Sequence, residues 1–190
     1  MARPKKIAGI PGAEERITTA FLQMLEESGY SSITIGGLAE RAQVNHNTIY
    51  YYYSNIDDLA ESVLRKTMKP QMAIRLFTAG PEALMVIRAM LASSDIRRRL
   101  HIIQLYASAE SSFLQSVLKR ALHEEILKHA SADDSSLSEA EKLTIEFLLS
   151  GFIRLMGHPG TRDNYAAIME FQSTSFGAQC REAMRNVLKL

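Results

Sequence analysis

Residues 38–53 read LAERAQVNHNTIYYYY, and this segment carries the most specific structural signal in the chain. Two short helices joined by a tight turn need apolar anchors where they touch and a small residue where they approach most closely. Ala39 supplies the small residue. The anchor positions are filled by Leu38, Ala42, Val44, Ile49 and Tyr53. The segment therefore predicts a helix-turn-helix, with helices over residues 35–42 and 46–53.

The second of these helices has an outer face that core packing does not explain. Counting about 100° per residue from Ile49 turns Tyr53 inward and leaves Tyr52 at the boundary. Four tyrosines in succession cannot all face a core, and the alternative of a short β-strand is disfavoured by helical patterns on both sides. Asn45 can cap the free amides at the start of the helix. The outward side chains are Asn47, Thr48, Tyr50 and Tyr51.

Helical patterns continue along the rest of the chain. Alternating β patterns are nearly absent, and Gly and Pro number only 10 and 5, so we expect an all-α fold. A capping box from Ser138 to Glu141 would start one helix after a polar loop at 131–137. Beyond the helix-turn-helix, the expected helices cover residues 13–28, 56–69, 81–91, 95–107, 111–130, 138–156 and 176–190.

Composition excludes several classes of protein. The chain has 190 residues, of which 46% are hydrophobic, so it can bury a core and is neither disordered nor fibrous. The net charge of +1 favours neither nucleic-acid nor membrane binding by itself. No apolar run approaches the ~20 residues that a membrane-spanning helix needs, and the N-terminus lacks a secretory signal. The single cysteine, Cys180, cannot form an internal disulfide, which favours a cytoplasmic location.

The N-terminal segment resembles the TetR family of one-component transcriptional regulators over about residues 13–65. The matching residues are Gly29-Tyr30-Ser31-Ser32-Ile33-Thr34-Ile35, Leu38-Ala39, Ala42, Val44, Thr48-Ile49-Tyr50-Tyr51-Tyr52-Tyr53 and Leu59. The resemblance implies a dimeric repressor that binds a palindromic double-stranded DNA operator and is released by a small-molecule effector. Residues 1–55 would form an N-terminal arm and the DNA-binding domain. Residues 56–190 would form a helical ligand-binding and dimerisation domain.

The resemblance also implies which residues contact DNA. Thr34 would cap its helix and bind a phosphate, the residues that open the second helix would read base edges, and the tyrosines would bind phosphate and sugar. The basic N-terminal arm would lie along a minor groove, the alternative being a solvated terminus. The assigned residues are Thr34, Asn45, His46, Asn47, Thr48, Tyr50, Tyr51, Tyr52, Lys5 and Lys6.

Several positions depart from the family pattern. Gln43 replaces a glycine in the turn, Ile56 replaces a frequent lysine, and Gly36 and Gly37 weaken the helix that they occupy. Residues 1–60 hold five basic and seven acidic side chains, a net charge of −2, which is acidic for a DNA-binding unit. The alternative function is therefore a TetR-fold co-activator or receptor that has lost operator binding.

The helix expected over residues 138–156 is apolar on more than one side, which indicates self-association. The alternative is that the last two predicted helices bury each other within one subunit. The expected dimer contacts are Leu148, Gly151, Phe152, Leu155, Phe176, Cys180, Met184 and Val187. Flexible methionines and neighbouring apolar residues suit a pocket for an effector. The candidate ligand-binding residues are Met68, Met72, Met85, Met90, Ile103, Tyr106 and Phe113.

No catalytic constellation is evident in the sequence. Paired carboxylates in an apolar setting, a nucleophile with a base, and a phosphate-binding loop are all missing, so we expect no enzymatic activity. The five histidines show no pair at metal-ligand spacing, and Cys180 has no second cysteine to join it. We therefore expect neither a metal nor a cofactor.

Overall fold

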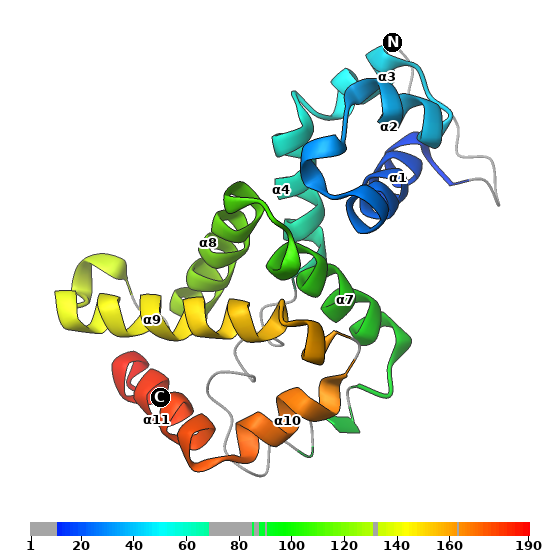
Figure 1. Cartoon of the computed structure of the whole chain (residues 1–190). Helices are drawn as coiled ribbons and strands as arrows, with labels where there is room; N and C mark the ends of the chain where they lie inside the picture. Colours follow the sequence, from blue (N-terminus) through cyan, green and yellow to red (C-terminus); the bar gives the residue numbers. More distant parts are fainter. Residues whose placement is uncertain (1–10, 69–84, 86–87, 90, 131–132, 163) are drawn as a thin grey trace. The chain divides into compact units, whose positions relative to one another are not determined.

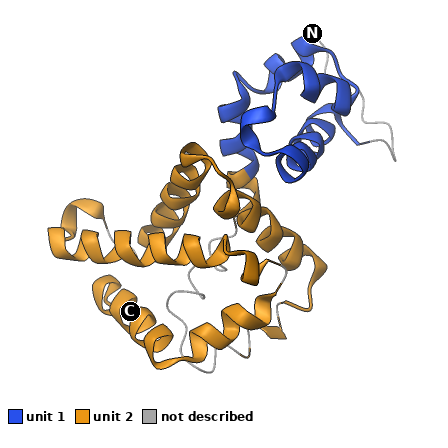
Figure 2. Cartoon of the chain, in the orientation of Figure 1, with its two compact units in different colours: residues 1–63 blue, residues 64–190 orange. Residues whose placement is uncertain are grey.

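The computed structural model describes residues 11–68, 85, 88–89, 91–130, 133–162 and 164–190, and their regular secondary structure is entirely helical (Figure 1). The chain divides into two compact units, residues 1–63 and residues 64–190 (Figure 2). The division falls inside α4 (Ile56–Thr67), eight residues after the boundary expected from the sequence. None of the described helices is long and apolar enough to cross a membrane.

The first unit is built around α1 (Ala13–Ser28), which packs against α2 (Ile35–Ala42) and α3 (His46–Tyr52). The bounds of α1 and α2 are those predicted from the sequence. Gly29 ends α1 with a φ of 78°, and the short 3₁₀ helix η1 (Tyr30–Ser32) follows. The apolar stripe of α1 is buried at Ile17, Ala20, Phe21 and Leu25, as its 3.6-residue period predicts.

The second unit holds a core of three helices that pack against one another. These are α7 (Ser94–Ser108), α8 (Ser112–His129) and α9 (Glu139–Met156). The sequence pattern predicted one apolar stripe on α7, through Ile96, Leu100, Ile103 and Ala107. Instead every residue from Ile102 to Ala107 is buried, because α8 and α9 both pack against this helix. The capping box predicted at Ser138 and Glu141 is present.

After α9 the chain forms a corner of shorter helices. The 3₁₀ helix η3 (Pro159–Thr161) leads to α10 (Tyr165–Ser173) and then to α11 (Ser175–Leu188), which packs against α9 (Figure 1). The sequence predicted α11 but not α10. The polar loop before α9 contains a 3₁₀ helix, η2 (Asp134–Ser136). The helix expected over residues 81–91 lies mostly outside the described residues.

Two glycines allow close approach of backbones in the second unit. A Cβ at Gly157 would overlap the carbonyl group of Ala107 and lie 2.8 Å from the Ser108 nitrogen, so Gly157 lets the end of α9 touch α7. A Cβ at Gly177 would overlap the Phe171 carbonyl oxygen and lie 3.0 Å from Gln172 Cα. Gly177 therefore allows the tight corner between α10 and α11.

Gly157→Ala should lower the free energy of unfolding by about 1–3 kcal/mol, the usual cost of forcing extra atoms into a packed site. The φ of Gly157 is −85°, so backbone strain does not contribute. Chemical denaturation monitored by circular dichroism measures the change. Gly151→Ala is the matched control, because a Cβ there meets nothing within 4 Å and alanine favours a helix interior. An equal effect of the two substitutions would contradict the close contact.

Candidate nucleic-acid interface

Side-chain caps fix the starts of both helices in the helix-turn-helix. Thr34 Oγ1 accepts a hydrogen bond from the Gly37 backbone nitrogen at 3.1 Å, at the start of α2. Asn45 Oδ1 accepts from the Thr48 nitrogen at 2.8 Å and from the Thr48 hydroxyl at 2.9 Å, at the start of α3. Both caps were predicted from the sequence, and each satisfies an amide that a helix start leaves free.

The turn between α2 and α3 depends on a left-handed residue. Gln43 has φ 52° and ψ 50°, the conformation in which glycine is favoured. The Val44 nitrogen donates to the Ala39 carbonyl oxygen at 3.0 Å, which is the six-to-one hydrogen bond of a Schellman motif. Gln43 thus takes the glycine position of an ordinary helix end, and its side chain is exposed.

The outer face of α3 is exposed as its helical period predicts. The exposed fractions of Tyr50, Tyr51 and Tyr52 are 57%, 80% and 39%, whereas Tyr53 is 4% exposed. Ile49 is fully buried. His46 and Asn47 are exposed and Thr48 is half-buried. One face of this short helix therefore presents aromatic hydroxyls, an imidazole and an amide to the surroundings.

The two glycines of α2 play different parts. A Cβ at Gly37 would lie 3.0 Å from Met24 Cε and 3.3 Å from Thr34 Oγ1, so this glycine makes room for α1 and for the cap. A Cβ at Gly36 would meet only Thr34 Oγ1 at 3.9 Å and His46 Nε2 at 4.0 Å, which are ordinary contacts. Packing thus accounts for Gly37 and leaves Gly36 unexplained.

Several acidic side chains of this unit are engaged in internal contacts. Glu27 Oε2 pairs with Arg41 Nη1 at 2.5 Å, and Asp58 Oδ2 accepts a hydrogen bond from the Ser54 nitrogen at 2.9 Å. The Tyr30 hydroxyl donates to Asp57, and burial together with this hydrogen bond raises the pKa of Tyr30. Residues 45–53, which form α3 and its cap, include no acidic side chain. The negative net charge of the unit therefore does not arise from the exposed face of α3.

The other predicted DNA contacts, Lys5 and Lys6, lie outside the described residues, as do Met72 and Met90 of the predicted ligand set. Met85 is 77% exposed and Met68 is buried. None of the five described candidates, Met68, Met85, Ile103, Tyr106 and Phe113, lines the groove described below. The groove went unnoticed in the sequence because α10, which forms part of its wall, was not predicted.

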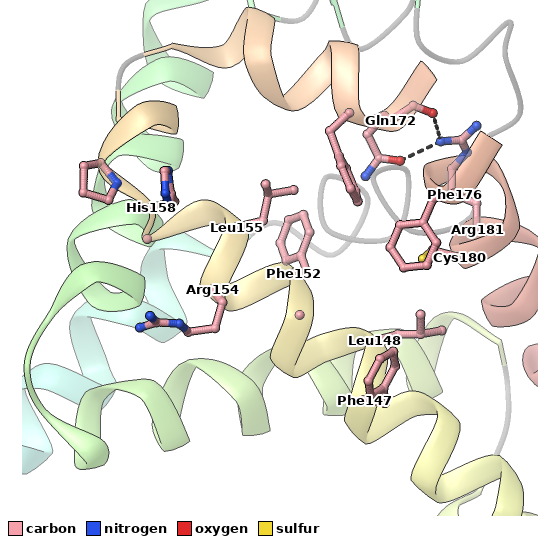
Figure 3. A pocket seen from close by; sticks show the side chains of 14 residues that line it. Phe147, Leu148, Phe152, Arg154, Leu155, His158, Gln172, Phe176, Cys180 and Arg181 are labelled. Carbon is pink, nitrogen blue, oxygen red and sulfur yellow. Dashed lines mark hydrogen bonds between the residues drawn. The ribbon is translucent and has the colours of Figure 1, made fainter. Parts of the chain in front are cut away.

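The α9–α11 face contains most of the predicted dimer contacts. Leu143, Phe147 and Phe176 have exposed fractions of 67%, 70% and 56%. Leu148, Gly151, Phe152, Leu155, Phe176 and Cys180 line one groove between α9 and α11 (Figure 3). Met184, however, is fully buried, so it is a core residue and not an exposed contact, and Val187 is half-buried.

Two capped helices, a tight left-handed turn and an exposed outer face define the first unit as a helix-turn-helix DNA-binding domain. The family model described as "Bacterial regulatory proteins, tetR family" matches residues 17–63, from α1 to the last residue of the unit. Residues 17–63 are therefore a helix-turn-helix domain of the TetR family. No curated protein matches the chain.

Gln43→Gly should raise the free energy of unfolding by about 1 kcal/mol, because glycine adopts the left-handed conformation without the steric cost that a Cβ brings. Thermal or denaturant unfolding of the full chain measures the gain. Gln43→Ala is the control, since alanine meets the same steric cost as glutamine and should leave stability nearly unchanged. If glycine and alanine behave alike, the turn has another geometry.

Proposed function

We propose that the chain is a dimeric repressor that reads a palindromic operator with α3 and is released by a small-molecule effector. The observation that carries the proposal is the outer face of α3, which is exposed, free of acidic side chains and rich in hydrogen-bonding groups. A helix of this kind fits the major groove, where base edges present donors and acceptors.

The geometry supports distinct roles for the side chains of the face. Asn47 is exposed and has the amide that pairs with the N6 and N7 edge of adenine. The Thr48 hydroxyl donates to Asn45, so at a base it can act only as an acceptor. Thr34 Oγ1 accepts at the cap, which leaves its hydroxyl hydrogen for a phosphate. The hydroxyls of Tyr50 and Tyr52 suit phosphates, which position the domain without reading sequence.

The exposed apolar face of α9 and α11 supports the dimer. Leu143, Phe147 and Phe176 are large apolar side chains exposed on neighbouring helices, a patch that a monomer rarely leaves in water. Two such helices from each copy would form a four-helix contact around a twofold axis. A twofold dimer would present two copies of α3 to two half-sites, which is the reason to expect a palindrome.

A TetR-fold receptor without operator binding is the second candidate. It is favoured by Ile56, which stands where a phosphate-binding lysine is frequent, and by the charge of −2 over residues 1–60. Affinity for random duplex DNA at low salt separates the two functions. An operator-binding protein retains non-specific affinity that falls steeply as salt rises, whereas the receptor would show none.

Asn47→Ala should relax base preference at one position of the selected site, with a loss of about 1–3 kcal/mol of discrimination. Tyr50→Phe should weaken specific and non-specific binding alike, because it removes a phosphate contact. Selection from a random DNA pool, followed by fluorescence anisotropy, measures both effects. Tyr165→Phe, the same chemical change in the second unit, should alter neither. If Asn47→Ala selects the wild-type site with undiminished preference, α3 does not read bases through this residue.

Phe147→Glu should convert the dimer to a monomer at micromolar concentration, because a charge would replace a large side chain of the exposed apolar face. Light scattering measures the mass, and DNA binding should weaken with it. Leu190→Glu is the control, since Leu190 is also exposed but lies at the end of the chain. A wild-type protein that is already monomeric would contradict the dimer.

A further inference from the structure

A groove of about 540 Å³ is enclosed by α9, η3, α10 and α11 (Figure 3). Its volume lies within the range of about 300–1,000 Å³ that small-molecule sites occupy. Most of the fourteen lining side chains are apolar. The largest apolar side chains among them are Phe147, Phe152, Phe171 and Phe176. Such an apolar lining suits the alkyl or aryl part of a small-molecule ligand.

The groove also contains a buried cation. Arg181 is 7% exposed, and its Nη1 donates to the backbone oxygen of Gln172 and, at 2.7 Å, to Gln172 Oε1 (Figure 3). Both acceptors are uncharged. No carboxylate of the described residues forms an ion pair with Arg181. Burial lowers the pKa of this guanidinium, yet an arginine stays charged in proteins. A charge held this way is costly until an anion reaches it.

The remaining donors of Arg181 match a carboxylate. Gln172 occupies Nη1, which leaves the edge formed by Nε and Nη2, and two parallel N–H groups on such an edge fit the two oxygens of a carboxylate. The other polar lining side chains include Arg154 and His158, and none of the fourteen carries a negative charge. The described lining of the groove is therefore apolar with basic groups, the pattern of a site for an amphipathic anion.

A second copy of the chain fits this groove less well than it fits the neighbouring surface. An adjoining hollow shares Phe147, Leu148, Phe176 and Cys180 with the groove, and none of its described lining residues is charged. A twofold contact brings the same surface of both copies together, so the uncharged hollow can meet its own copy. The groove with Arg154 and Arg181 would bring like charges together.

We propose that the groove binds an organic monocarboxylate with an apolar body, whose carboxylate is held by Nε and Nη2 of Arg181. A single buried guanidinium favours one negative charge over the two of a phosphate monoester. That this ligand is the effector rests on the proposed function, in which α9 and α11, the helices that line the groove, also provide the dimer face.

The test is isothermal titration calorimetry of the full chain with decanoate, decanol and decyl phosphate. Decanoate should bind one molecule per chain, about tenfold or more tightly than decanol, since a charge-assisted hydrogen bond is lost with the alcohol. It should also bind more tightly than decyl phosphate. Equal binding of decanoate and decanol, tighter binding of the phosphate, or no binding of decanoate would each overturn the proposal.

Three variants locate the site. Arg181→Met should weaken decanoate binding about tenfold or more and leave decanol unchanged. Gly151→Phe should abolish binding of both by filling the groove, and the added side chain has room at its base because a Cβ at this position meets nothing within 4 Å. Arg185→Met is the control on the same helix, where the arginine is exposed and outside the groove. Circular dichroism checks the fold of each variant, and undiminished decanoate binding by folded Gly151→Phe would overturn the site.

DNA release is measured separately, by adding decanoate to the complex with the selected operator. Binding without release would leave the carboxylate site in place and remove its role as the effector site. If decanoate releases DNA from the wild-type protein and does not bind the Arg181→Met and Gly151→Phe variants, both the carboxylate site and its role as the effector site are supported. The two results therefore distinguish the ligand site from the regulatory function.

Discussion

The direction of α3 depends on one left-handed residue, Gln43. Its conformation lets the Val44 nitrogen reach back to the Ala39 carbonyl, which ends α2 and turns the chain within three residues. The Asn45 cap then starts α3 at once. Because the turn is this short, rotation of α3 is restricted, and Ile49 stays buried while Tyr50 and Tyr51 stay exposed. The exposed face that supports DNA binding is thus a consequence of backbone geometry as much as of the tyrosines themselves.

Local signals allowed the first unit to be predicted closely. Caps, glycine stops and the 3.6-residue period act within a few residues of one another, so the bounds of α1 and α2 and the cap at Asn45 could be derived from sequence, whereas the cap at Thr34 was implied by the resemblance to the family. The left-handed conformation of Gln43 was considered only because the family has glycine there. A sequence read without that comparison gives no sign of it, since glutamine does not indicate a positive φ.

The second unit shows what local patterns cannot supply. The burial of α7 from Ile102 to Ala107 arises from packing by α8, which follows it directly, and by α9, which begins some thirty residues later. The role of Gly157 depends on Ala107, fifty residues earlier. The predicted ligand set centred on methionines, whereas the groove is formed by α9, η3, α10 and α11. Arg181 was not singled out, because a charged residue on an amphipathic helix is expected to face water until the structure shows it buried.

The single cysteine has a practical consequence for solution work. Cys180 lines the groove, and burial raises the pKa of its thiol, with the opposing effect of Arg181 being smaller. A thiol of raised pKa reacts slowly with alkylating reagents at neutral pH, because the thiolate is the nucleophile. Since the chain contains no other cysteine, every modification event reports on this one place. The rate at which Cys180 is alkylated therefore measures how often the space between α9 and α11 opens to the solvent.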